Sequence, residues 1–147
     1  MPVPNLQLER LSPVGGNAIV DPGATLAFDE IVSSEGLGTY IDYDINTGII
    51  TFLEAGYYYI DWYVAPQFGL TTNGSNWAIQ TYMSGLSFTG SSHAKVSVTT
   101  GFALINAEAG ETAQLVNVSD GALYLSNVVE SKAGLIVISI GVFNLAP

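Results

Sequence analysis

The residues that could support nucleophilic catalysis lie in one short segment, GSSHAK, where Ser91 and Ser92 precede His93, the single histidine of the chain. A serine nucleophile needs a base that the fold holds within hydrogen-bonding distance of its hydroxyl. Residues that are adjacent in sequence do not form such a pair, and the chain has no G-x-S-x-G turn to present a nucleophile. We therefore expect His93 to be a surface residue and the protein not to be an enzyme.

Carboxylates offer a second kind of chemistry, the binding of a cation. Asp42 and Asp44 lie two positions apart, so on a strand they share one face and could hold Ca²⁺ together with backbone carbonyls. The alternative is a solvated strand edge, where like charges discourage edge-to-edge pairing. Asp29, Glu30 and Glu35 form a second acidic cluster, for which solvation is the simpler interpretation. We expect no metal and no other cofactor, and cation binding at Asp42 and Asp44 stays open.

Sugar binding is a third chemistry that the residue types allow. Trp77 and Tyr82 follow the polar loop GLTTNGSN, residues 69–76, and exposed aromatic rings beside such a loop could stack on a sugar ring. A core or interface position for Trp77 is the competing interpretation. Sugar binding would make the protein a carbohydrate-binding head, as in a lectin or a phage tail fibre, which is our alternative to a role in assembly.

The segments that must position these residues are short, rich in Val, Ile, Tyr, Phe and Thr, and closed by Gly, Asn, Asp or Pro, which is the pattern of strands and turns. No segment keeps a helical period over three turns. Ten strands are predicted, over residues 18–20, 25–31, 39–44, 48–53, 57–65, 77–84, 94–106, 112–118, 123–129 and 134–144. Ten strands in one small domain indicate two packed sheets, a β-sandwich or jelly roll.

The length and composition of the chain fix its domain organisation and exclude some partners. The 147 residues suffice for one domain, placed at residues 17–147, and residues 1–16, with three prolines, are expected to form a loosely ordered N-terminal segment. Three basic residues stand against thirteen acidic ones, which disfavours nucleic acid and anionic membranes as partners. The absence of cysteine excludes disulfides and thiolate metal sites.

The segment NTGIITFLEAGYYYIDWYVAP, residues 46–66, carries large apolar side chains on both faces of a predicted strand. Because side chains alternate along a strand, the core face is predicted to consist of Tyr58, Ile60, Trp62 and Val64. The opposite face then consists of Tyr57, Tyr59, Asp61 and Tyr63. An antiparallel sandwich normally keeps its outer faces polar, so this second face needs a partner to cover it.

The last predicted strand shares this property. One of its faces carries Ile136, Ile138, Ile140 and Val142, and the other carries Leu135, Val137, Ser139, Gly141 and Phe143. A long loop or the N-terminal segment could cover the second faces. We favour another subunit, because exposed apolar patches above a few hundred Å² usually mark interfaces. The predicted interface of this homo-oligomer consists of Tyr57, Tyr59, Tyr63, Leu135, Val137 and Phe143.

The segment YDINTGIITFLEAGYYYIDWYV resembles the signature of the tumour-necrosis-factor (TNF) and complement-component-1q globular heads. In that family an acidic turn closed by Gly leads into a strand, and after a short loop ending in Gly the next strand alternates aromatic residues. The matching positions are Tyr43, Asp44, Gly48, Ile50, Gly56, Tyr58, Ile60 and Trp62. Ile50 and Ile60 depart from the family pattern, in which Phe is usual.

The later segments AEAGETAQLVNVS and AGLIVISIGVF are similar to bacterial relatives, above all to the C-terminal heads of collagen-like glycoproteins of the spore exosporium. The resemblance implies an all-β, ten-stranded TNF-like jelly-roll β-sandwich that forms a homotrimer. It further implies that the head nucleates a collagen-like stalk and displays a surface for adhesion, in contact with host proteins or glycans. The implied location is extracellular, on the spore surface, although no Gly-X-Y stalk is present in the sequence.

Overall fold

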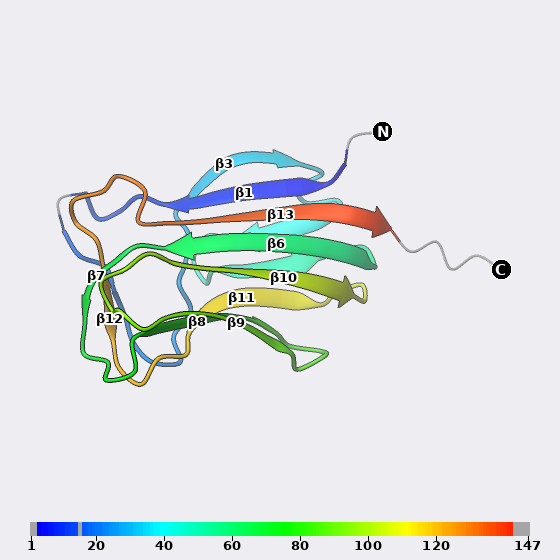
Figure 1. Ribbon diagram of the computed structural model, residues 1–147. Helices are drawn as coiled ribbons and strands as arrows, with labels where there is room; N and C mark the ends of the chain where they lie inside the picture. Colours follow the sequence, from blue (N-terminus) through cyan, green and yellow to red (C-terminus); the bar gives the residue numbers. More distant parts are fainter. Residues whose placement is uncertain (1–2, 15, 143–147) are drawn as a thin grey trace.

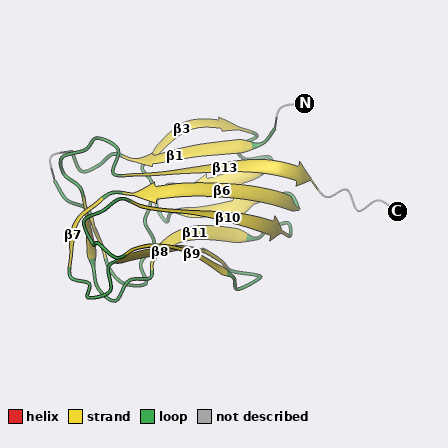
Figure 2. Ribbon diagram, viewed as in Figure 1, coloured by secondary structure: helices red, strands yellow, loops and turns green. Residues whose placement is uncertain are grey.

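The computed structural model describes residues 3–14 and 16–142, which form strands and no helix (Figures 1 and 2). The described residues form thirteen strands: β1 (Asn5–Arg10), β2 (Ile19–Val20), β3 (Glu30–Glu35), β4 (Ile41–Asp44), β5 (Ile49–Phe52), β6 (Gly56–Val64), β7 (Pro66–Gly69), β8 (Ser75–Thr81), β9 (Ser87–Ser92), β10 (Thr99–Ala107), β11 (Thr112–Asn117), β12 (Leu123–Leu125) and β13 (Ala133–Val142). The predicted all-β class is confirmed, with more strands than the ten expected. No helix in the described part of the chain could cross a membrane.

The strands form two five-stranded sheets and one three-stranded sheet, and neighbouring strands in each run antiparallel. The first sheet has the order β10-β6-β13-β1-β3, and the second has the order β4-β5-β11-β8-β9. The small sheet, β2-β12-β7, lies at the end of the molecule opposite to the end at which β1 begins and β13 ends (Figure 1). The predicted two-layer jelly roll is therefore the observed architecture.

The core lies between the two large sheets and follows the strand alternation. The predicted core face of β6 is confirmed, because Tyr58, Ile60, Trp62 and Val64 are all buried. From the second sheet Trp77 and Phe52 project into the same core, and the rings of Phe52 and Tyr58 lie 4.4 Å apart between their centroids. Burial of these large apolar side chains is the main stabilising contribution to such a sandwich.

Within the predicted N-terminal segment, residues 5–10 are well ordered, so the prediction of a loosely ordered segment is wrong for them. These residues form β1, which lies between β13 and β3 in the first sheet. Leu6 and Leu8 alternate with polar residues and are completely buried in the core. The prolines at positions 4 and 13 flank this strand rather than interrupt it, which leaves every N–H of the strand available for pairing. The domain therefore includes residues that the sequence assigned to a separate segment.

The predicted strand 25–31 is mostly irregular backbone that still reaches the core. Leu26 and Phe28 are buried, and the hydroxyl of Tyr43 both accepts a hydrogen bond from the Phe28 N–H (2.7 Å) and donates one to the Phe28 carbonyl (2.8 Å). Burial raises the pKa of Tyr43 to about 12, so its hydroxyl stays protonated and remains a donor. A buried tyrosine thus satisfies backbone groups that a strand partner would otherwise satisfy.

Other differences from prediction lie at strand boundaries and edges. The predicted strand 94–106 begins only at Thr99, because residues 94–97 form a turn in which the Ser97 N–H donates to the Ala94 carbonyl (3.2 Å). The strand predicted at 123–129 ends at Leu125. Two further strands, β7 and β9, were not predicted. β7 contains a proline and a glycine, and β9 contains a glycine followed by two serines. Both lie at sheet edges, where such residues are tolerated.

Candidate functional site: the open face of the first sheet

The outward side of β6 is not covered by the protomer. Tyr57 and Asp61 are exposed, and Tyr59 and Tyr63 are half-buried. The prediction that these four residues share the face opposite to the core is confirmed. Whether another subunit covers them stays a prediction.

Neighbouring strands extend the apolar character of this side. Tyr59 pairs with Leu104 of β10 and with Ile138 of β13, so these three residues form one row across the sheet. Cross-strand partners share a face and contact each other. Leu104 is 54% exposed and Ile138 is 40% exposed, although both are large aliphatic residues. The row is therefore a strip of apolar surface in contact with water.

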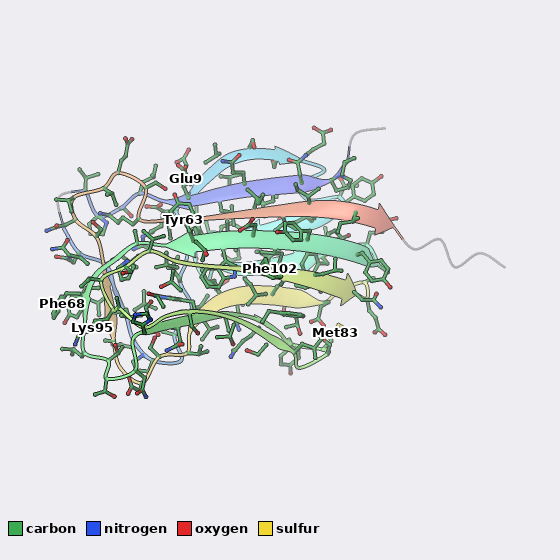
Figure 3. All side chains as sticks on the ribbon, viewed as in Figure 1. Glu9, Tyr63, Phe68, Met83, Lys95 and Phe102 are labelled. Atoms are coloured by element: carbon green, nitrogen blue, oxygen red, sulfur yellow. The ribbon has the colours of Figure 1, made fainter. Side chains whose placement is uncertain are left out.

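A second row runs parallel to the first. Asp61 pairs with Phe102 of β10 and with Ile136 of β13, and Phe102 is 71% exposed. Ile140, further along β13, is 59% exposed. We call this surface the open face; it consists of Phe102, Leu104, Tyr57, Tyr59, Asp61, Tyr63, Ile136, Ile138 and Ile140 (Figure 3 labels Phe102 and Tyr63). Asp61 is the ionisable carboxylate within it.

Two predicted interface residues, Leu135 and Val137, lie on the wrong side of β13 for that role. They pair with Trp62 and Ile60 of β6, so they share the core face of those residues and are buried. The isoleucines at 136, 138 and 140 are the ones that face outward. With apolar residues on both sides, the strand alone gave no signal to distinguish its faces. Phe143, also predicted at the interface, lies outside the described residues.

The side chain of Tyr63 lies across the neighbouring strand instead of projecting outward. A Cβ atom added at Gly134 of β13 would come within 2.4 Å of Tyr63 Cε1, so the ring occupies the space that the glycine leaves. The Tyr63 hydroxyl also forms a hydrogen bond with the Ser131 hydroxyl. Tyr63 is therefore packed within its own protomer, and Tyr57 and Tyr59 are the tyrosines more open to a partner.

The β9–β10 edge of the open face is hollowed. A shallow cavity of about 560 Å³ opens there, lined by Asp61, Phe88, Thr89, Gly90, Thr100, Gly101 and Phe102. Below it lies the indole of Trp62, and a Cβ atom added at Gly101 would come within 2.3 Å of that ring. The Trp62 Nε1 is buried and has no hydrogen-bond partner among the described residues. The edge is thus recessed where the face ends, and its lining mixes aromatic and polar side chains.

The polarity of the first sheet changes towards its other edge. Asn5, Gln7 and Glu9 of β1 continue the outward rows, and Glu30 and Glu35 of β3 pair with Glu9 and Asn5. Glu30 and Glu35 are exposed, as predicted for this acidic cluster. The first sheet therefore carries an apolar half over β10, β6 and β13, and an acidic edge at β1 and β3.

Asp29, the third member of the predicted cluster, has a structural role. Its carboxylate accepts hydrogen bonds from the N–H groups of Leu11 (2.8 Å) and Ser12 (3.0 Å), which fix the chain after β1. Burial by itself would raise the pKa of Asp29, but these hydrogen bonds, with the nearby charge of Arg10, leave that pKa below its ordinary value. Asp29 is therefore half-buried and holds the backbone after β1, a role that solvation alone does not describe.

The candidate catalytic and metal residues do not converge. Ser91 Oγ donates to Asn76 Oδ1 (2.5 Å), Ser92 Oγ donates to the Ala94 carbonyl (3.3 Å), and His93 is exposed. Asp42 and Asp44 each accept a hydrogen bond from a nearby backbone N–H, those of Tyr43 (3.0 Å) and Asn46 (2.9 Å). Within residues 3–14 and 16–142, no three His, Cys, Asp or Glu side chains are grouped to hold a metal ion.

The aromatic pair considered for sugar binding is not a pair in space. Trp77 is completely buried and donates its Nε1–H to Ser75 Oγ (2.9 Å), whereas Tyr82 is 86% exposed. The core interpretation of Trp77 is therefore correct, and a sugar site built on these two residues is not.

Sequence reasoning missed the β10 contribution to the open face. Phe102 and Leu104 alternate with the buried Ala103 and Ile105, so the segment GFALINA has apolar residues on both faces, as β6 does. Apolar residues on both faces of this segment were the signal in the sequence that could have predicted its outward apolar side chains.

Comparison with known proteins finds the fold in solved structures. No protein-family model matches the chain, and no curated protein matches it. The globular domain of the zebrafish complement 1qA protein is 16% identical, with a TM-score of 0.67, over 97% of this chain and 100% of that one. Eiger TNF from S. frugiperda is 13% identical, with a TM-score of 0.63, over 100% of this chain and 98% of that one.

The PRD1 vertex protein P5 is also similar, with 18% identity and a TM-score of 0.61, over 96% of this chain and 100% of that one. Identities this low show the fold alone. The fold that the sequence resemblance implied is confirmed: this chain has the jelly roll of the TNF and complement 1q globular heads.

Proposed function

We propose that this protein is the homotrimer-forming, non-enzymatic head of a collagen-like surface glycoprotein, and that it assembles through the open face. The observation that carries the proposal is the continuity of exposed apolar side chains over β10, β6 and β13. Removing apolar surface from water contributes about 25 cal/mol per Å². Copies of the same chain, packed on one another through this face, gain that contribution.

A cyclic arrangement fits the uneven polarity of the first sheet. In a closed ring each chain contributes the same surfaces to every interface, so an apolar half can turn towards the axis in all copies at once. The acidic edge formed by β1 and β3 then stays at the periphery, where Glu30 and Glu35 keep their hydration. For Glu30 and Glu35 this avoids the several kcal/mol that burial of an unpaired carboxylate costs, whereas Asp61, within the open face, lines the recess at the β9–β10 edge. The neighbouring chain can pack into the recess at the β9–β10 edge.

The proposed setting, outside the cell on the spore surface, rests on the sequence resemblance to exosporium glycoproteins. The fold is compatible with a stalk: β1 begins beside the end of β13, and the Ser139 N–H donates to the Pro4 carbonyl (2.9 Å). A collagen-like stalk joined before β1 leaves from that end (Figure 1). The opposite end, which carries the small sheet, is then the part displayed for adhesion and host contacts.

The oligomeric mass in solution tests the proposal. Light scattering coupled to size-exclusion chromatography, at micromolar concentration, should give three times the mass of the 15.5 kDa chain. Crosslinking at low protein concentration should stop at a trimer. A single-chain mass across the concentration range contradicts the proposal, because the open face would then be stable in water.

A further inference from the structure

A second aromatic surface lies on the small sheet, away from the open face. Tyr124 of β12 pairs with Ile19 of β2 and with Phe68 of β7, so the three side chains form one row across the three strands. The ring centroids of Phe68 and Tyr124 are 4.3 Å apart, with an interplanar angle of 36°. Ile19 and Phe68 are exposed and Tyr124 is half-buried. We call this row the aromatic platform.

Amide side chains border the platform. Gln67 sits at the irregularity between β7 and β12, and its Oε1 accepts hydrogen bonds from the Asn127 N–H (2.8 Å) and from Asn17 Nδ2 (3.4 Å). Asn17 Nδ2 also donates to the Leu125 carbonyl (2.8 Å). Among the described residues, Gln67 Nε2 and Asn17 Oδ1 have no hydrogen-bond partner. The Gln67 Nε2 donor and the Asn17 Oδ1 acceptor are therefore held in place, because the other polar atom of each amide is hydrogen-bonded to the protein. Both remain available to a ligand.

The position of the platform leaves it accessible. It lies at the end of the sandwich opposite to the start of β1 and the end of β13, where Figure 3 labels Phe68. Its residues belong to a different sheet from the open face, so its use does not depend on the proposed trimer.

We propose that the aromatic platform is a binding site for a neutral sugar residue of a glycan. The apolar C–H face of a pyranose can lie on Phe68 and Tyr124, while its hydroxyls accept from Gln67 Nε2 and donate to Asn17 Oδ1. Aromatic rings flanked by amides suit a ligand that is apolar on one face and hydroxylated at its rim.

The charge of the protein favours a neutral ligand over an anionic one. The formal net charge is −10, with three basic residues. Lys132 is buried and donates to the Ser126 carbonyl, and the guanidinium of Arg10 donates to the carbonyls of Ser12 (2.7 Å) and Ala27 (2.7 Å). The third, Lys95, donates to the Thr71 carbonyl (3.3 Å). A sialylated or sulfated sugar would meet repulsion with little compensation.

An array of neutral oligosaccharides, ending in galactose, glucose, mannose, fucose or N-acetylglucosamine, with sialylated counterparts, tests the site. At least one neutral probe should bind, and saturation-transfer NMR should show contact between its C–H groups and the protein. Phe68→Ala and Tyr124→Ala should each weaken that binding by about tenfold or more. Tyr124→Phe, which keeps the ring, should change it less. Gln67→Glu keeps the Oε1 acceptor, removes the Nε2 donor, and should weaken binding.

Tyr82→Ala is the control, because it removes an aromatic ring that is more exposed than those of the platform and lies in the β8–β9 turn. It should leave sugar binding unchanged. The site is overturned if no neutral probe binds the parent protein, if sialylated probes bind better, or if both platform variants bind as the parent does. The oligomeric mass of each variant separates this site from assembly: a platform variant that loses its trimer would show that the platform is a subunit contact instead.

Discussion

The two large sheets of this sandwich share one core but present opposite characters to the outside. In the second sheet Asp42, Thr51 and Thr112 form one outward row across β4, β5 and β11, and Gln114 pairs with Gln80 across β11 and β8. In the first sheet the corresponding row is Leu104, Tyr59 and Ile138. A polar outer face is what a water-exposed antiparallel sheet normally has. The second sheet has polar rows of this kind on its outer face, whereas the first sheet is apolar there over β10, β6 and β13.

Charged residues make up only 11% of the chain, and the two outer faces show that polar side chains are not spread evenly between the sheets. Because both sheets have equally buried inner faces, the demands of the core cannot explain why only one has an apolar exterior. The comparison is internal to one molecule, so the first two predictions below can be tested against a matched position on the other sheet.

The largest effect is expected from a charge placed on the open face. Tyr59→Glu should dissociate the trimer, because it adds a second carboxylate two residues from Asp61 in each chain, in the middle of the apolar row, and these charges repel each other and lose hydration at a cost of several kcal/mol each. The matched variant Gln80→Glu, on the polar sheet, should keep the trimer and change stability by no more than about 0.5 kcal/mol. Light scattering and thermal unfolding measure both.

Circular dichroism of Tyr59→Glu should still report β-structure, because the core is untouched, unless the monomer is too unstable alone, in which case folding and assembly are lost together. If Tyr59→Glu remains trimeric and as heat-stable as the parent, the distinction between the two sheets has no bearing on assembly.

The next effect concerns the inner face that both sheets share. Trp62→Ala should lower the free energy of unfolding by roughly 3 to 5 kcal/mol, through lost burial and the cavity left behind. Trp77→Ala, its counterpart on the second sheet, should cost a similar amount, with the loss of the Nε1–H bond to Ser75 added. Chemical denaturation measures both. A loss below about 1 kcal/mol for Trp62→Ala would mean that the core does not depend on this side chain as its burial indicates.

The smallest effect concerns a buried carboxylate on the polar sheet. Glu111 accepts hydrogen bonds from the N–H groups of Tyr82 (3.1 Å), Met83 (2.7 Å), Ser84 (2.9 Å) and Thr112 (2.9 Å), which fix the β8–β9 turn. Burial by itself would raise the pKa of Glu111, but the hydrogen bonds hold it below the ordinary 4.5. Glu111→Gln should cost about 1 to 3 kcal/mol at neutral pH without changing the oligomeric mass.

The pH dependence follows from the sign of that shift. A lowered pKa means that the ionised carboxylate stabilises the fold fully above pH 4.5, and that this contribution is lost as the pH falls through the lower, folded-state pKa. The gap in stability between parent and Glu111→Gln should therefore narrow below pH 4.5. Glu108→Gln, at an exposed position just before Glu111, is the control and should show no such gap. A gap that does not change with pH would show that shape, and not charge, fixes the turn.

Much of the fold could be predicted because strand alternation is a local property. The inward face of β6 follows directly from the spacing of Tyr58, Ile60 and Trp62. The strand β1 was missed because its prolines suggested a loose segment, and only pairing with β13 and β3 shows that Leu6 and Leu8 have a core to fill. Such pairing joins parts of the chain that are distant in sequence, and no local pattern contains it.

The candidate site was predictable only in part, for a related reason. A strand that is apolar on both sides has no preferred face until its neighbour is known, which is why Leu135 and Val137 were assigned outward and Ile138 inward. β6 avoided this error because Asp61 marks its outward side. β10 is also apolar on both sides. Its outward residues, Phe102 and Leu104, can be identified only from their pairing with Asp61 and Tyr59 of β6.

The place of β1 between β13 and β3 also has a consequence for the order in which the molecule is made. During synthesis the first strand emerges long before the last, and its pairing with β13 must wait until the C-terminal strand has left the ribosome. Until then the first sheet has a gap beside β1, with Leu6 and Leu8 uncovered on their β13 side. The head therefore closes only after β13 has been made, so any assembly of several heads starts from chains whose β13 has already been synthesised.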